Sequence, residues 1–208
     1  MRLDDPRVLR RLRASDPVLA ELIRRAPRFA IRPDPMQSPY EALFESIVYQ
    51  QLSGRAAATI LGRVKASFGK GPFPSPDAVL AAPDEQLRGA GLSRAKTAAV
   101  KDLALKARDG HVPDVDALHG MDDDAIVEHL TAIRGIGRWT VEMMLIFRLG
   151  RPDVLPVHDY GVRNGFRLAY RKRALPTPTQ LAKFGERWRP YRTVASWYLW
   201  RAVELSRA

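Results

Sequence analysis

Residues 130–166, LTAIRGIGRWTVEMMLIFRLGRPDVLPVHDYGVRNGF, predict two helices joined by a glycine turn and followed by a loop between prolines. Gly135 and Gly137 allow positive φ and close backbone approach within the turn. The second helix is expected to begin at Arg138 and to end before the two prolines, which cannot continue it. Together with the apolar spacing upstream, this pattern predicts a helical hairpin at about residues 123–149.

The turn of this hairpin has the features of a phosphate-binding site. Its short glycine segment presents backbone N–H groups at a helix start, and Arg134 and Arg138 flank it with positive charge. The same pattern also fits an ordinary helical hairpin whose glycines serve only the turn. The turn alone does not decide between these interpretations.

The combination of GIGRWT with LPVHDYGVRNGF resembles the helix-hairpin-helix and Gly/Pro-Asp loop of DNA glycosylases, and within that superfamily the AlkA-type 3-methyladenine DNA glycosylases. The resemblance implies an all-α fold of two interwoven helical lobes with a cleft between them, and no N-terminal β domain. We expect residues 1–208 to form one glycosylase unit. Its central lobe would span about residues 41–150, and its second lobe about residues 1–40 plus 151–208.

Composition indicates an ordinary soluble protein, with 46% hydrophobic and 27% charged residues. The chain has no cysteine, which excludes disulfides, thiol catalysis and the iron–sulfur cluster of some relatives. No apolar run predicts a signal peptide or a membrane span, so we expect a cytoplasmic protein without a membrane partner. Its histidines show no metal-ligand spacing, so we expect no catalytic metal and no required cofactor.

The formal net charge is +11, and residues 163–208 contain eleven Lys and Arg against two Glu. Such a basic excess is typical of a protein with a polyanionic partner, and the affinity then falls with salt. An arginine-rich, solubilising surface is the alternative. The resemblance implies double-stranded DNA with damaged bases as the partner, bound by a monomer.

Asp159 precedes a helical pattern, where aspartate is a favoured N-cap residue. Capping is compatible with a second role, because the positive end of the helix dipole favours the ionised carboxylate. Cleavage of an N-glycosidic bond develops positive charge on the sugar. A carboxylate nearby stabilises that charge, or orients and deprotonates the water that attacks C1′. By resemblance, Asp159 is the expected catalytic residue.

The resemblance also implies the residues that surround a flipped base: Trp139, Tyr160, Tyr191 and Met143. Bifunctional relatives carry a lysine nucleophile where this chain has Trp139, so we expect hydrolysis without strand cleavage by a lyase reaction. An indole face also attracts a cationic alkylated purine. Helix packing is the alternative role for Trp139. At position 158 this chain has a histidine where many relatives have an aspartate.

The segment YQQLSGRAA resembles the loop that inserts an apolar wedge into the base stack, with Leu52 at the wedge position. The pattern alone favours a core position for Leu52. The resemblance places DNA contacts at Gln51, Ser53, Arg94, Lys96, Arg134, Gly135, Gly137, Arg138 and Thr140. It also implies that the backbone carbonyls of Thr131, Ile133 and Ile136 hold Na⁺ or K⁺ against a phosphate.

Three functions follow from the sequence. The first is a monofunctional glycosylase that excises 3-methyl or 7-methyl purines from duplex DNA and leaves an abasic site for base excision repair. The second is a glycosylase of the same fold for deaminated, etheno or N1/N3-methylated bases, because Met143 and Tyr191 depart from the pocket residues usual in relatives. The third is a non-enzymatic module that only binds the DNA backbone.

Overall fold

The computed structural model describes residues 3–34, 36 and 38–207, and this part of the chain contains helices and loops but no β-strand. The all-α prediction is therefore confirmed. The chain divides into a terminal unit, Met1–Pro35 with Glu142–Ala208, and a central unit, Met36–Val141. The boundary between Val141 and Glu142 lies inside a helix. Residues 1, 2, 35, 37 and 208 lie outside the described residues.

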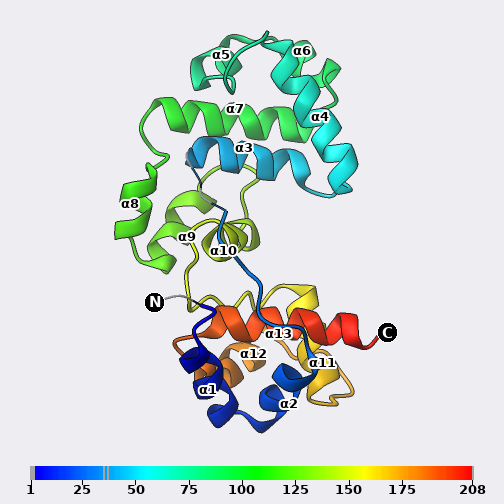
Figure 1. The fold of residues 1–208 in the computed structure, drawn as a ribbon. Coiled ribbons are helices and arrows are strands. Elements are labelled where there is room, and N and C mark those ends of the chain that lie inside the picture. Colours follow the sequence, from blue (N-terminus) through cyan, green and yellow to red (C-terminus); the bar gives the residue numbers. More distant parts are fainter. Residues whose placement is uncertain (1–2, 35, 37, 208) are drawn as a thin grey trace. The chain divides into compact units, whose positions relative to one another are not determined.

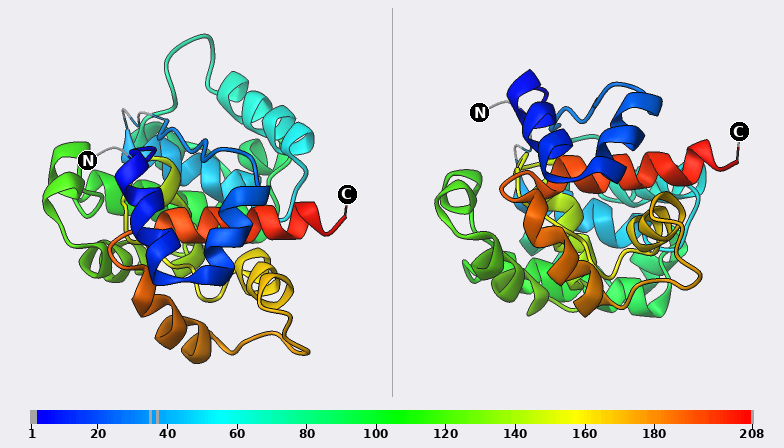
Figure 2. Two further views of the ribbon diagram at one scale, coloured as in Figure 1. Left: turned by 60° about the horizontal axis from the view of Figure 1, so that its bottom comes forward. Right: turned by 90° about the horizontal axis from the view of Figure 1, so that it is seen from below.

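The terminal unit is built around its last helix, α13 (Arg192–Leu205), which packs against α11 (Tyr160–Ala169) and α2 (Pro17–Arg25). Seen from below, α13 runs between the N-terminal helices on one side and α11 and α12 on the other (Figure 2). The remaining elements are α1 (Pro6–Ser15), α12 (Pro178–Gly185), the 3-10 turn η1 (Glu186–Trp188) and the end of α10 (Arg138–Phe147).

Backbones of α11 and α13 approach closely at Gly165. A Cβ added to this glycine would lie 1.9 Å from the carbonyl oxygen of Leu199. Only glycine allows this approach, since real Cβ atoms are not found so near a backbone oxygen. The close packing fixes α11, which Asp159 starts, against the helix that carries Trp200.

A buried carboxylate connects three parts of the terminal unit. Asp16 is 1% exposed and caps α2 through Oδ1, which accepts the N–H groups of Val18 and Leu19, each at 3.0 Å. Its Oδ2 accepts the Tyr170 hydroxyl at 2.5 Å and Trp188 Nε1–H at 3.0 Å. Burial, together with the bond to this carboxylate, raises the pKa of Tyr170 far above its usual value. The N-cap residue of α2 is thus also a core anchor.

The central unit contains α3 to α9 and the first residues of α10, and α3 lies along α7 (Figure 1). Phe44 and Tyr40 of α3 make edge-to-face contacts with Phe73. The bounds are α3 (Pro39–Tyr49), α4 (Gly54–Ser67), α5 (Pro76–Ala81), α6 (Asp84–Gly89), α7 (Arg94–Arg108), α8 (Val115–Gly120) and α9 (Asp123–Thr131).

Three features of this unit differ from what local sequence patterns predict. The helical spacing of Ala98, Leu103 and Leu105 predicts a buried Leu105, but this side chain is 40% exposed in α7. Residues 109–121 predict a loop by their sequence, but they contain α8, which Asp114 caps and Leu118 anchors in the core. Gly135 has a positive φ of 81°, but Gly137 is not among the glycines with positive φ. No helix in the described chain has the length and apolar character that a membrane crossing requires.

Candidate active site

The Asp159 carboxylate is held by two donors within the terminal unit. As N-cap of α11, its Oδ1 accepts the Val162 N–H at 2.7 Å, which satisfies a free donor of the helix start. The same Oδ1 accepts Nε1–H of Trp200 from α13 at 2.8 Å. Two bonds from different helices fix the plane of a half-buried carboxylate, which a single cap bond would leave free to turn.

The Trp200 indole stacks on Phe147 and lies close to Gly161. Its indole stacks on Phe147 at the end of α10, with ring centroids 5.9 Å apart and an interplanar angle of 22°. A Cβ at Gly161 would lie 2.8 Å from Cδ1 of Trp200 and 3.0 Å from Asp159 Oδ1. Glycine at position 161 therefore leaves the space in which the indole meets the carboxylate.

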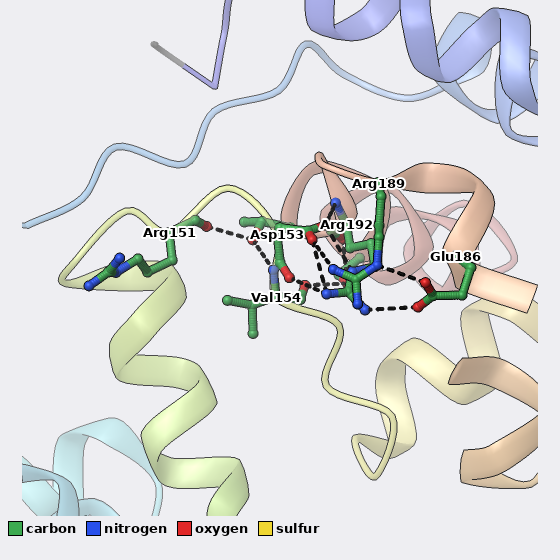
Figure 3. A network of polar contacts seen from close by, with 8 residues as sticks. Arg151, Asp153, Val154, Glu186, Arg189 and Arg192 are labelled. Carbon is green, nitrogen blue, oxygen red and sulfur yellow. Dashed lines mark hydrogen bonds and ion pairs between the residues drawn. The ribbon is translucent and has the colours of Figure 1, made fainter. Parts of the chain in front are cut away.

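The loop that leads to Asp159 is fastened to the start of α13 through Asp153 (Figure 3). The Asp153 carboxylate accepts Nε–H and Nη2–H of Arg192 at 2.8 and 3.0 Å, and Nη1–H of Arg189 at 2.5 Å. Glu186 bonds both arginines, and the bond from Arg189 lowers the pKa of Glu186 below its usual value. Bidentate pairing of this kind has a defined geometry, so it fixes position as well as charge.

Backbone bonds complete the attachment of this loop. Thr193, fully buried in the first turn of α13, donates its hydroxyl to the Arg151 carbonyl at 2.6 Å and accepts the Val154 N–H at 3.0 Å. Its own N–H donates to the carbonyl of Pro152 at 3.1 Å. Helix α13 thus holds the loop at one end and the Asp159 carboxylate, through Trp200, further along.

The predicted pocket residues differ in exposure. Tyr160 is 67% exposed and Trp139 is 48% exposed, which is unusual for large aromatic side chains and argues against plain helix packing for Trp139. Met143 and Tyr191 are half buried, and Tyr191 packs against the core of the terminal unit. His158 is exposed. Trp139 belongs to the central unit, and its part in a base pocket stays a prediction.

Leu52 lies in the loop between α3 and α4 and is 40% exposed, as is its neighbour Tyr49. This exposure disagrees with the alternative that Leu52 is a core residue. Gln51 has a positive φ of 56°, so the loop turns sharply just before Leu52. Ser53, predicted to contact DNA, caps α4 by accepting the Ala56 N–H at 3.4 Å.

The hairpin turn between α9 and α10 contains Gly135, whose φ is 81°. The side chain of Arg138 is 51% exposed and lies 3.9 Å from Asp124, a pairing that solvent weakens. Arg134 is exposed, whereas Thr140 is 8% exposed and offers little side-chain surface. First-turn N–H groups of a helix have no intrahelical acceptor, so the start of α10 suits a phosphate.

The two remaining predicted contacts lie at the start of α7 and differ from each other. Arg94 is exposed. The ammonium of Lys96 donates to the carbonyls of Val48 and Gln50, each at 2.7 Å. Burial lowers the pKa of Lys96 from its usual value. These bonds were not predictable from the sequence, because a backbone carbonyl can accept a hydrogen bond whatever the residue type.

A monovalent cation at the carbonyls of Thr131, Ile133 and Ile136 stays a prediction. The last carbonyls of a helix lack intrahelical donors, and just past α9 the Ile133 carbonyl accepts the Ile136 N–H at 3.1 Å. Lys106 donates to the adjacent carbonyl of Ala132 at 2.5 Å, so a positive charge already lies there. Among the described residues, no group of three or more His, Cys, Asp or Glu is arranged for a metal ion.

Comparison with known proteins places these features in a family context. The model of the HhH-GPD superfamily base excision DNA repair proteins matches residues 44–190. DNA-3-methyladenine glycosylase 1 of Schizosaccharomyces pombe is 38% identical over 170 residues, which cover 82% of this chain and 75% of that protein.

Two solved structures are similar along nearly the whole chain. The S. pombe 3-methyladenine DNA glycosylase Mag1, in complex with abasic DNA, has a TM-score of 0.82 and 34% identity over 97% of this chain and 98% of its own. A DNA-3-methyladenine glycosidase from Bacillus halodurans has a TM-score of 0.86 and 36% identity, and covers 100% of this chain and 94% of its own.

Proposed function

Because the chain belongs to the HhH-GPD superfamily of base excision DNA repair proteins, we propose that it is a DNA glycosylase for alkylated purines. It hydrolyses the N-glycosidic bond of 3-methyl or 7-methyl purines flipped out of duplex DNA and leaves an abasic site. The relatives named DNA-3-methyladenine glycosylase support this substrate class, as does the relative bound to abasic DNA.

Asp159 supplies the negative charge that this reaction needs. As the base departs, positive charge develops on the sugar, and a fixed carboxylate stabilises it without reorganisation during the reaction. The same carboxylate orients and deprotonates the water that attacks C1′. The observation that carries the assignment is the attachment of Asp159 Oδ1 to both Val162 N–H and Trp200 Nε1–H.

Hydrolysis without a lyase step is part of the proposal. A lyase reaction needs an amine nucleophile that forms a Schiff base with the sugar, and Trp139, at the start of α10, has none. Water is then the nucleophile, and the DNA strand stays intact. The exposed indole of Trp139 attracts a cationic methylated purine by about 0.5–2 kcal/mol, which favours alkylated over neutral bases.

Release of free base from methylated duplex DNA tests the activity. We expect 3-methyladenine or 7-methylguanine to be released, with strand breaks only after alkali treatment. Asp159→Asn should lose excision and bind DNA at least as tightly, because a negative charge is removed. A variant that excises at the wild-type rate contradicts the role of Asp159, and strand breaks without alkali contradict hydrolysis without lyase.

The same assay separates the two other candidate functions. A panel with deaminated, etheno and N1/N3-methylated bases ranks the lesions, and preference for one of these contradicts the alkylated-purine assignment. A protein that binds duplex DNA but releases no base from any lesion is a DNA-binding module only.

A further inference from the structure

One face of α7 contacts both loops that the family resemblance assigns to DNA. Lys96, Ala99, Asp102 and Lys106 are spaced by three, three and four residues, so they lie along one side of the helix. We call these four residues the α7 stripe. Its N-terminal member contacts the loop that carries Leu52, and the other three contact the hairpin turn.

Lys96 fastens the end of α3, from which the Leu52 loop departs. Its ammonium donates to the carbonyls of Val48 and Gln50, each at 2.7 Å, where the last carbonyls of α3 lack intrahelical donors. A cation at a helix C-terminus also interacts favourably with the helix dipole. These bonds hold the backbone immediately before Gln51 and Leu52.

The other members of the stripe hold the hairpin turn. Asp102 Oδ2 accepts the Arg134 N–H at 2.7 Å and Nζ–H of Lys106 at 3.0 Å. Although burial raises the pKa of Asp102, these two bonds outweigh it, so the pKa lies below its usual value. Lys106 also donates to the Ala132 carbonyl.

A direct bridge and a close contact connect the two loops. A Cβ on Gly135 would lie 2.9 Å from the Cβ of Ala99, so the turn lies directly on α7. The side-chain amide of Gln50 donates to the carbonyl of Gly135 at 2.8 Å and thereby joins the Leu52 loop to the turn. The two loops therefore share anchors on one rigid helix and with each other.

We propose that the α7 stripe sets the position of Leu52 relative to the phosphate-binding turn, and that Lys96 is a positioning residue for base flipping. The inference rests on the proposed function, since it assumes that Leu52 enters the base stack. Filling the gap in the stack offsets the cost of flipping only if the apolar side chain is held in place while the turn grips the backbone. A loosely held Leu52 loses this advantage.

A direct phosphate contact by Lys96 predicts a different outcome. Each lysine–phosphate contact steepens the salt dependence of binding by about one unit of slope, equally for damaged and undamaged DNA. Two of the three N–H bonds of the Lys96 ammonium already point to protein carbonyls. Removal of Lys96 should therefore leave the salt slope unchanged and impair flipping.

A double-mutant cycle of Lys96→Met with Leu52→Ala tests the proposal. We expect Lys96→Met to lower the single-turnover excision rate on methylated duplex by roughly tenfold or more, the loss typical of a bond made by a charged group. Leu52→Ala should lower the same rate because it removes the apolar side chain that fills the base stack. The double variant should excise no more slowly than the slower single variant, because both substitutions remove the same function, the insertion of Leu52 into the base stack. Lys101→Met is the matched control on α7, since its ammonium pairs with Asp84 instead.

Fluorescence of 2-aminopurine placed opposite an abasic analogue reports stack insertion without excision. We expect Lys96→Met and Leu52→Ala to abolish the change that wild-type binding produces, and Lys101→Met to keep it. The proposal is overturned if the rate loss in the double variant is the product of the two single losses. It is also overturned if Lys96→Met reduces the slope of DNA affinity against salt concentration by about one. If Lys96→Met unfolds at a lower temperature than the wild type, the same measurements on Gln50→Ala test the proposal. This substitution removes only the exposed hydrogen bond to the Gly135 carbonyl.

These readouts separate failure of the inference from failure of the proposed function. A wild-type protein that changes the fluorescence but releases no methylated base contradicts the function and leaves the α7 stripe testable by fluorescence. A wild-type protein that excises, with Lys96→Met equal to wild type in both assays, contradicts the positioning role alone.

Discussion

Trp200→Phe removes the hydrogen bond from the indole to Asp159 and keeps an aromatic ring against Phe147. The lost bond is 2.8 Å long and ends on the same Oδ1 that accepts the Val162 N–H. A hydrogen bond to a charged group contributes about 1.5–3 kcal/mol. If that energy serves the placement of the carboxylate in the transition state, the excision rate falls by roughly 10- to 150-fold, since 1.36 kcal/mol corresponds to tenfold.

Single-turnover release of 7-methylguanine from duplex DNA measures this loss, with protein in excess over substrate. We expect a slower chemical step and an unchanged affinity for DNA that contains an abasic analogue, because Trp200 acts through Asp159. Trp197→Phe, three residues earlier on α13, is the matched control, since the Trp197 ring packs edge-to-face on Phe29 in the core. A rate for Trp200→Phe within about twofold of the control would refute the reasoning, since the bond would then contribute less than its expected energy.

Two glycines of α11 give further predictions. Gly161→Ala puts a methyl group 2.8 Å from Trp200 and 3.0 Å from Asp159 Oδ1, so we expect an excision rate at least tenfold lower. The midpoint of unfolding by urea should stay near that of the wild type, because alanine favours the helix by about 1 kcal/mol. Wild-type excision by this variant would show that the indole has room to move. Gly165→Ala puts its methyl 1.9 Å from the Leu199 carbonyl oxygen, and we expect a loss of about 3 kcal/mol or more in the free energy of unfolding by urea. A loss under about 1 kcal/mol would mean that α11 and α13 separate easily.

Helix starts were predictable because their chemistry is local. Asp16 before Pro17, Ser93 before α7 and Asp159 before α11 each place a side-chain acceptor next to unsatisfied N–H groups, and the structure has all three caps. The interruption between α3 and α4 was visible for the same reason, since Ser53 starts the next helix. Local rules therefore located the loops in which the candidate functional residues lie.

Long-range partners were not predictable in the same way. Trp200 lies 41 residues beyond Asp159 in an aromatic-rich helix, where the sequence pattern indicated mainly core packing. Lys96 reads as a solvated charge, and its acceptors are backbone carbonyls 46 and 48 residues away. The six-residue α8 was missed because one buried residue, Leu118, gives no periodicity. Leu105 was misassigned because the alternating Leu and Ala of α7 fit more than one buried face.

Capping and catalysis are compatible interpretations of Asp159, and in the proposed mechanism the cap is a condition for catalysis. A carboxylate that stabilises developing charge must keep its orientation, since reorganisation during the reaction would cancel the gain. The Val162 N–H supplies one fixed donor from the helix that Asp159 starts, and Trp200 supplies another from α13. The Gly165 contact holds these two helices backbone to backbone, so both donors stay in register. The caps at Asp16 and Asp159 both accept an indole N–H from a second element. Asp16 is 1% exposed, whereas Asp159 is only half buried, and this difference in exposure is the feature that sets the Asp159 cap apart.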